Sequence, residues 1–471
     1  MTTAVLQRRQ APLLVYLAAV GISLPAGTLV AKSQHGVSLA LLVLLGLAGL
    51  VVLISLPIHT LFLGWLFLAP LFQVSADESA IGAAGVWAIY TVPALLFIVV
   101  TLARSGTAAI SASDFLPLAY LVFVLASFAI TNEEIHTRPI GALRGIFLTV
   151  GIGIIVYYFL TLGPGSSIPA ERIVAVMLAA AFLQGLFAVA ELFTGWHLWP
   201  STGWDQLGGG EHSRVVATLA NPAVLGVFLG SAIVTAVAVL TYRGPSMLRR
   251  PSIAVLAICV PGLLATLTRA PIAGTLGAVL LILIFGRLRY VALAVLATAA
   301  IVIFALLPSI QASELYQKRV NERTNIRVRS NLQDWSLRLW EQRPILGFGH
   351  GRFDDVKRAS GFSANGVSIK YVRYYTSHNT YLTTLVELGL VGFILYVVPF
   401  FLIGYRGIAR ARSRSPDQWL AVACLGSLFV LVFTSSTIDF RFFSIALMLP
   451  WLYLALLRRM ERTQPPGALS G

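Results

Sequence analysis

Long apolar runs, separated by short polar or charged turns, recur from residue 11 to residue 457. A helix needs about 20 mainly apolar residues to cross a bilayer core, and most of these runs approach that length. The pattern predicts about fourteen membrane-spanning helices, near residues 11–30, 37–56, 58–74, 86–103, 115–130, 140–162, 172–193, 214–240, 253–268, 271–285, 291–307, 379–404, 418–436 and 443–457. The predicted fold class is therefore an all-α polytopic integral membrane protein with about 12–14 transmembrane helices.

Composition supports a membrane protein. Of the 471 residues, 57% are hydrophobic and 11% are charged, whereas soluble proteins average about 25% charged residues. These values exclude a soluble enzyme with one compact core and a secreted disulfide scaffold. Cys259 and Cys424 lie far apart inside apolar runs, so they say nothing about the redox compartment.

The distribution of arginine predicts the orientation. Arg8 and Arg9 precede the first run, which places the N-terminus in the cytoplasm. Alternation then puts most basic clusters of the short loops on the cytoplasmic side. The chain divides into a cytoplasmic N-terminus, transmembrane helices 1–11, a long external loop, transmembrane helices 12–14 and a cytoplasmic C-terminal tail, at residues 1–10, 11–307, 308–378, 379–457 and 458–471.

The external loop is polar and basic, with twelve Lys and Arg against six Asp and Glu, a net charge of +6. Long loops cross the membrane largely regardless of charge, and the neighbouring short loops favour an outside position. Within it, Arg323 to Gln342 is predicted to form an amphipathic helix, with Leu332, Trp335 and Leu339 on one stripe and Pro344 ending it. This helix either lies on the membrane surface or covers a site facing the outer leaflet.

Ionisable side chains within apolar runs are expensive and are functional candidates by default; they are Arg144, Glu191, Arg269, Glu387, Asp439 and Arg441. Arg269 lies between the runs 253–268 and 271–285, which as helices are about 24 and 22 Å long against a core of about 30 Å. This hairpin is expected to sink its tip below the outer headgroups, where a guanidinium is a strong phosphate ligand. The alternative is an arginine that extends its side chain to the outer interface.

A second candidate is His378, where the long loop meets the next run. Imidazole titrates near neutrality and suits proton abstraction from a sugar hydroxyl, although a histidine at such a place can also be a plain interfacial residue. Asn379 is placed to cap the following helix. Glu387 lies two to three turns deeper and needs a partner, either a basic side chain or a proton.

Motifs for cofactors are missing from the sequence. Gly347-Phe-Gly349-His-Gly351 lacks the third glycine and the flanking strand of a dinucleotide loop, and there is no Walker loop or Asp-x-Asp pair. The seven histidines and two cysteines show no metal-ligand spacing. We therefore predict neither a cofactor nor a metal.

Four ordered stretches carry a family resemblance: Arg214 to Pro222, Leu267 to Ala270, Trp340 to Phe353, and Ser377 through Glu387 to Gly392. In this order, with the long loop between the second and fourth, they resemble the O-antigen ligase and O-antigen polymerase superfamily. The resemblance covers roughly residues 200–400. The second stretch reads Thr-Arg-Ala where Ser-Arg-Gly is commoner, and the number of predicted spans exceeds the usual twelve or so.

The resemblance implies a bacterial membrane glycosyltransferase of the GT-C type, active at the outer face of the plasma membrane. Such enzymes use a polyprenyl-diphosphate-linked glycan, such as one on undecaprenyl diphosphate, and need no metal or nucleotide. His378 matches the essential histidine of the family, Arg269 its membrane arginine, and Arg214 a second arginine near the donor diphosphate. We expect inverting transfer, with His378 taking the acceptor proton and with Arg214, Arg269 and loop arginines such as Arg338 or Arg343 stabilising the departing diphosphate. Glu387 and Asn379 complete the set of expected substrate-binding residues.

The expected partners are a lipid-linked glycan, an acceptor and membrane lipids, and the net charge of +15 fits an anionic lipid diphosphate far better than nucleic acid. The acceptor is a glycan, a lipid such as lipopolysaccharide core, or a protein, and the sequence does not choose among them. A transporter or flippase of lipid-linked glycan is the alternative from another class, but the two similar halves that it requires are not seen in the sequence. A non-catalytic binder of the same lipid-linked glycan also stays open.

Overall fold

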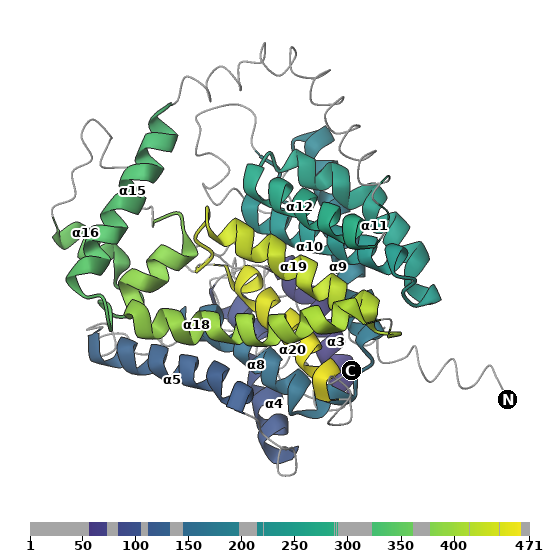
Figure 1. The fold of residues 1–471 in the computed structure, drawn as a ribbon, viewed down its shortest axis with the longest axis horizontal. Helices are drawn as coiled ribbons and strands as arrows, with labels where there is room; N and C mark the ends of the chain where they lie inside the picture. Colours follow the sequence, from purple (N-terminus) through teal and green to yellow (C-terminus); the bar gives the residue numbers. More distant parts are fainter. Residues whose placement is uncertain are drawn as a thin grey trace, which may run out of the picture.

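The structure is a computed structural model that describes residues 56–72, 83–104, 112–131, 145–196, 214–219, 221–286, 288, 290, 323–360, 377–413, 415–441 and 443–462. Within this part of the chain the regular elements are helices (Figure 1). The α-helices are α3 (Ile58–Leu68), α4 (Ala83–Arg104), α5 (Ala112–Thr131), α8 (Ile152–Thr161), α9 (Ala170–Thr194), α10 (Pro222–Thr241), α11 (Ser246–Ala265), α12 (Arg269–Phe285), α15 (Arg323–Gln342), α16 (Phe353–Ala359), α18 (Thr380–Arg412), α19 (Gln418–Ser435) and α20 (Ser444–Arg462). Short 3₁₀ turns η1 (Ala69–Phe72) and η3 (Pro164–Ser167) and the π-helical turn η2 (Phe147–Gly151) complete them.

The predicted all-α membrane fold is confirmed at the level of class. Six of the described helices are long and apolar enough to cross a membrane, and four further apolar helices are shorter. The amphipathic helix predicted at Arg323–Gln342 has those bounds in α15. The predicted spans at 11–30 and 291–307, and all but the last residue of 37–56, lie outside the described residues, as does Arg144.

For two predicted spans, the predicted position of the helix start is wrong. The run 214–240 does not begin as a helix, because α10 starts only at Pro222, where the Asn221 side chain accepts hydrogen bonds from the amides of Ala223 and Val224. The run 253–268 begins earlier, since α11 extends back through the polar turn that starts at Ser246. Of the two helices that meet at the Arg269 turn, only the second, α12, is therefore as short as predicted, with 17 residues.

Helix α10 lies at the centre of the fold. It packs against α9, α11, α12 and α19, and nearly all of its side chains are buried. A helix that is apolar all round belongs in a core rather than at the surface. Small residues allow close approach along it, since a Cβ at Gly226 would meet Pro271 of α12 and a Cβ at Gly262 of α11 would meet Leu229.

The helices divide the molecule into two ends. At the first, which we name the arginine end, Arg406 pairs with Glu461, Arg410 pairs with Asp417, and Arg459 donates to the carbonyl of Ile168 before α9. These contacts join the C-terminal ends of α18 and α20 to the N-terminal ends of α9 and α19. The basic clusters predicted to face the cytoplasm at 406–412 and 458–462 are therefore neighbours.

The opposite end, the histidine end, contains the start of α18. Thr380 donates to the carbonyl of Ile438 at 2.9 Å, and the Tyr381 hydroxyl donates to the carbonyl of Val432 at 3.0 Å, so the first turn of α18 lies beside the C-terminal end of α19. Helices α15 and α16 lie at one side of the molecule and contact α18 there, while the group α9–α12 lies at the other side (Figure 1).

Candidate functional site

The turn Ser377-His378-Asn379 leads into α18. The Asn379 Oδ1 accepts hydrogen bonds from the amides of Tyr381 and Leu382 at 2.9 and 3.2 Å, which confirms the predicted helix cap. His378 has a φ of +53°. A non-glycine residue in the left-handed region is uncommon and costs about 1–3 kcal/mol, so the surroundings must hold it there.

The His378 imidazole is half-buried and lies within the electrostatic influence of two cations. Burial, together with the charges of Arg329 on α15 and Lys357 on α16, lowers the pKa of His378 to about 3. The imidazole is consequently neutral at physiological pH, the state in which it can accept a proton. Helices α15 and α16, which lie in the predicted external loop, therefore bear directly on the electrostatics of this histidine.

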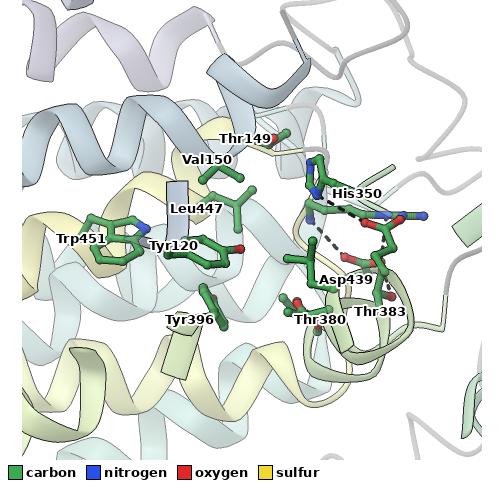
Figure 2. A pocket seen from close by; sticks show the side chains of 14 residues that line it. Tyr120, Thr149, Val150, His350, Thr380, Thr383, Tyr396, Asp439, Leu447 and Trp451 are labelled. Carbon is green, nitrogen blue, oxygen red and sulfur yellow. Dashed lines mark hydrogen bonds and ion pairs between the residues drawn. The ribbon is translucent and has the colours of Figure 1, made fainter. Parts of the chain in front are cut away.

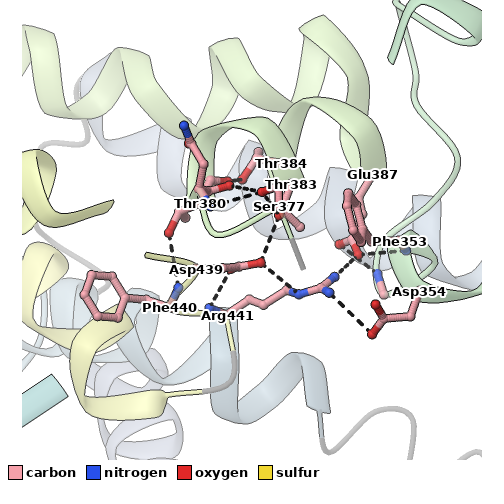
Figure 3. A network of polar contacts seen from close by, with 12 residues as sticks. Phe353, Asp354, Ser377, Thr380, Thr383, Thr384, Glu387, Asp439, Phe440 and Arg441 are labelled. Atoms are coloured by element: carbon pink, nitrogen blue, oxygen red, sulfur yellow. Dashed lines mark hydrogen bonds and ion pairs between the residues drawn. The ribbon is translucent and has the colours of Figure 1, made fainter. Parts of the chain in front are cut away.

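A cluster of opposite charges lies next to this turn, centred on Arg441 (Figure 3). The Arg441 guanidinium pairs with the carboxylates of Glu387, Asp439 at 3.3 Å and Asp354 at 3.7 Å. Its cationic carbon also lies 5.4 Å from the ring centre of Phe353. Burial alone would lower the pKa of Arg441, but the carboxylates of Glu387, Asp439 and Asp354 outweigh it and raise that pKa, so the arginine stays charged.

The glycine-rich motif packs against a break in α18. At Gly389 the helix is interrupted, with φ +62° and ψ −167°. The interruption allows Phe348 and Gly349 to donate to the carbonyls of Val386 and Glu387, and Leu390 to donate to the carbonyl of Pro344. Positive φ at Gly347, Gly349 and Gly351 permits this path, so these glycines allow the loop to pair with the backbone of α18.

Glu387 supports the same loop with its side chain. It is 2% exposed and accepts hydrogen bonds from the amides of Gly351 and Phe353 at 2.9 and 3.1 Å. His350 Nδ1 lies 3.5 Å from its second oxygen. The basic partner that the sequence required for Glu387 is thus Arg441. Glu387 and Asn379 both hold the fold in place, and their predicted contact with substrate stays a prediction.

A cavity adjoins this cluster between α5, η2, α18 and α20 (Figure 2). Tyr120, Tyr396 and Trp451 form its aromatic side, with ring centres of Tyr120 and Tyr396 5.4 Å apart. Its polar side contains His350 and the first turns of α18. Burial lowers the pKa of His350, and the nearby Glu387 carboxylate opposes that shift.

Arg269 is the first residue of α12 and is exposed, with no hydrogen bond or ion pair to the described residues. It is also at the histidine end: a Cβ added at Gly274, five residues further along α12, would contact Phe433 near the C-terminal end of α19. An exposed arginine side chain with no partner among the described residues is available for an anionic ligand.

Arg214 begins a non-helical segment at the same end. The amides of Val216 and Ala217 donate to the carboxylate of Glu191 near the C-terminal end of α9, at 3.1 and 2.7 Å to its Oε2. This accounts for Glu191, whose carboxylate is satisfied within the apolar helix by backbone donors. Arg214, Arg269 and His378 therefore share one end of the helices, but none of the three lines the cavity of Figure 2.

The two arginines predicted on the external loop are both exposed. Arg343 lies over the ring of Phe348, with 4.9 Å from its cationic carbon to the ring centre. Arg338 lies on α15 beside the buried Leu339. Neither is in the Arg441 cluster, so their contact with the donor stays a prediction.

Sequence reasoning named Asp439 and Arg441 as candidates but did not select them for the site, and it missed His350. The available signal was an acidic and a basic residue two positions apart, between the apolar runs 418–436 and 443–457. Within the part of the chain that the structure describes, no three His, Cys, Asp or Glu side chains gather as metal ligands.

Comparison with known families places this geometry in context. Residues 253–397, about a third of the chain, match the family model described as O-antigen ligase. No curated protein matches the chain. The matched segment includes Arg269, α15, the glycine motif and His378. The resemblance of this segment to the O-antigen ligase superfamily is thereby confirmed, and the match supports an O-antigen ligase- or polymerase-like membrane glycosyltransferase at the family level.

Proposed function

We propose that the protein transfers a glycan from a polyprenyl-diphosphate donor to an acceptor hydroxyl at the outer face of the bacterial plasma membrane, as a ligase or a polymerase. The observation that carries this proposal is the neutral His378 at the turn into α18, with Arg329 and Lys357 near it. The family match over the same segment supports it.

In the proposed reaction the acceptor oxygen forms a bond to the anomeric carbon, and the bond from that carbon to the diphosphate oxygen breaks with inversion. His378 takes the hydroxyl proton, and the polyprenyl diphosphate leaves with the electron pair of the broken bond. Arg269, which is exposed and has no partner in the described residues, and Arg214 stabilise the charge on that diphosphate.

Donor binding also prepares the base. The positive charges of Arg329 and Lys357 contribute to the low pKa of His378 in the free protein. A diphosphate beside these cations offsets their charge, so the pKa of His378 rises when donor is bound. A base whose pKa lies nearer the working pH transfers protons more efficiently.

The proposal includes an orientation. The histidine end faces outward, the arginine end faces the cytoplasm, and both termini are cytoplasmic, with residues 308–378 as the external loop. The gathering of Arg406, Arg410, Arg459 and Arg462 at one end supports it, because basic residues accumulate on the cytoplasmic side.

The test is glycan transfer by the purified protein in detergent, with a synthetic polyprenyl-diphosphate glycan and a glycan acceptor. Wild type should form product, whereas a transporter or flippase forms no glycosidic bond and would yield none. His378→Gln should lower the rate by at least about 100-fold, within the range for loss of a general base.

A matched control is Arg358→Gln on α16, where Arg358 is exposed, pairs with Asp355 at the surface and donates to the backbone carbonyl of Asp354. This variant should retain wild-type transfer. Product formation by His378→Gln at the wild-type rate would remove the basis of the proposed function.

A further inference from the structure

A chain of buried hydroxyl groups connects Asp439 with the turn that carries His378 (Figure 3). Thr383 Oγ1 lies 2.9 Å from Asp439 Oδ2, and Ser377 Oγ lies 2.7 Å from Thr383 Oγ1. Ser377 and Thr383 are 0% and 3% exposed, and Asp439 is 7% exposed. Few water molecules therefore compete for these hydrogen bonds.

We infer that Asp439, acting through Thr383 and Ser377, is a positioning residue that holds His378 for proton transfer. This inference rests on the proposed function, because it gives Asp439 the role of positioning His378, the general base of that reaction. Asp439 is in the strap between α19 and α20, 61 positions from His378 in the sequence. Tertiary contacts, not closeness in the sequence, bring Asp439 beside the turn into α18.

The charge of Asp439 gives the chain of hydrogen bonds a direction. An ionised carboxylate accepts only, so Thr383 donates its one proton to Asp439. Thr383 then accepts from Ser377, whose proton lies between Thr383 Oγ1 and the carbonyl of Asn379 at 2.6 Å. The carboxylate therefore determines the orientation of the Thr383 hydroxyl and leaves it as an acceptor towards Ser377.

Ser377 in turn clamps the backbone on both sides of His378. Its hydroxyl contacts the Asn379 carbonyl and accepts from the Asn379 amide at 3.1 Å. The residue enclosed by these contacts is His378, with its left-handed φ of +53°. A strained backbone of this kind persists only where its surroundings hold it.

Asp439 is itself held at two points. Its Oδ1 accepts from the amide of Arg441 at 3.1 Å, and the neighbouring Phe440 amide donates to Thr380 in the first turn of α18 at 3.2 Å. Arg441 also pairs with Asp354, which binds Lys357 at 3.1 Å. The same strap is thus tied to the His378 backbone and to the helix that carries one of the cations near the imidazole.

The test compares three variants in the detergent transfer assay. Thr383→Val keeps the side-chain shape and removes the hydroxyl, Thr383→Ser keeps the hydroxyl, and Asp439→Asn removes the charge. Thr434→Val is the matched control, because Thr434 is a buried threonine near the end of α19 whose hydroxyl, among the described residues, donates within its own helix to the carbonyl of Val430.

Thr383→Val and Asp439→Asn should lower kcat by about 10- to 100-fold, the range for a small misplacement of a reacting group, with the KM for donor changed by less than about twofold. Thr383→Ser should stay within about threefold of wild type, and Thr434→Val should match wild type. If Thr383 had a purely structural role, Thr383→Val would instead lower the melting temperature, without a selective loss of kcat at an unchanged KM for donor.

Wild-type kcat in Thr383→Val would overturn the inference, and so would a loss that Thr383→Ser does not restore. With His378→Gln still inactive, either result would leave the proposed function standing. Should Asp439→Asn fail to fold, the pair at Thr383 decides the question.

Discussion

At the scale of single residues, Arg441 and its carboxylates form the most concentrated charge in the described structure near the site. Removing one partner of a buried ion pair leaves the other charge uncompensated. Glu387→Ala would do this to Arg441 and would also leave the amides of Gly351 and Phe353 without their acceptor. We expect a loss of about 3–5 kcal/mol in the free energy of unfolding.

Thermal unfolding in detergent measures this effect. The control is Asp355→Asn, since Asp355 is 47% exposed and its pairs with Arg352 and Arg358 are at the surface. Such pairs contribute about 1 kcal/mol or less. Equal melting temperatures for the two variants would contradict a supporting role for Glu387.

The lowered pKa of His378 predicts an unusual dependence on pH. Because the folded protein keeps the imidazole neutral down to about pH 3, kcat/KM should show no acid limb from His378 near its ordinary value of about 6.5. Arg329→Gln removes a charge that lowers this pKa, so an acid limb should move towards neutrality. Profiles of kcat/KM against pH for the two proteins test this, and identical profiles would contradict it.

The same shift affects stability. The unfolded chain binds a proton at His378 below about pH 6.5, whereas the folded chain does so only near pH 3. Stability is therefore lost as the pH falls through this interval, because the unfolded state binds more protons. In His378→Gln this contribution should disappear from the pH dependence of the melting temperature.

Some residue roles were readable from the sequence and others were not. Asn379 could be assigned as a helix cap because capping depends on local spacing alone. Glu387 was predicted to need a basic partner, but the identity of Arg441, 54 positions away, depends on which helices meet. Apolar runs do not reveal which helices will meet, because the apolar faces of different helices are chemically alike.

At the scale of elements, the break in α18 is the feature on which the glycine loop depends. Gly389 has a backbone conformation that only glycine adopts readily, and a Cβ there would collide with the carbonyl of Ile345. Gly389→Ala should therefore lower the free energy of unfolding by at least about 1–3 kcal/mol and reduce transfer.

Gly404 provides the control within the same helix. A Cβ at Gly404 meets nothing within 4 Å, and the backbone there is helical. Gly404→Ala should be neutral or stabilising by about 0.5–1 kcal/mol. Thermal unfolding and transfer assays on both variants test this, and a harmless Gly389→Ala would show that the break is not required.

Helix positions followed from apolar length, but helix ends and breaks did not. The bounds of α15 were predicted because its stripe and its terminating Pro344 are both local signals. The early start of α11 was missed because its first turn is polar, and the break at Gly389 was missed because, apart from Glu387, the apolar run continues through it. Both depend on contacts with other parts of the chain.

At the scale of the whole molecule, sequence alone suggested which basic clusters share a side, because alternation along the chain depends only on the number of spans. The structure brings the clusters of α18 and α20 together at the arginine end. The meeting of residues 377–387, 347–357 and 439–441 at the opposite end could not be foreseen, since it is a property of tertiary packing.

The proposed orientation predicts a pattern of chemical accessibility. Ser436 at the histidine end and Arg412 at the arginine end are both exposed, whereas the native Cys259 and Cys424 are buried and should react little. In spheroplasts treated with a membrane-impermeant maleimide, Ser436→Cys should be labelled and Arg412→Cys should not. Inside-out vesicles should reverse the result, because the reagent then reaches only the cytoplasmic face. Labelling of Arg412→Cys in spheroplasts, with Ser436→Cys protected, would invert the orientation and move His378 away from the outer face at which the proposed transfer takes place.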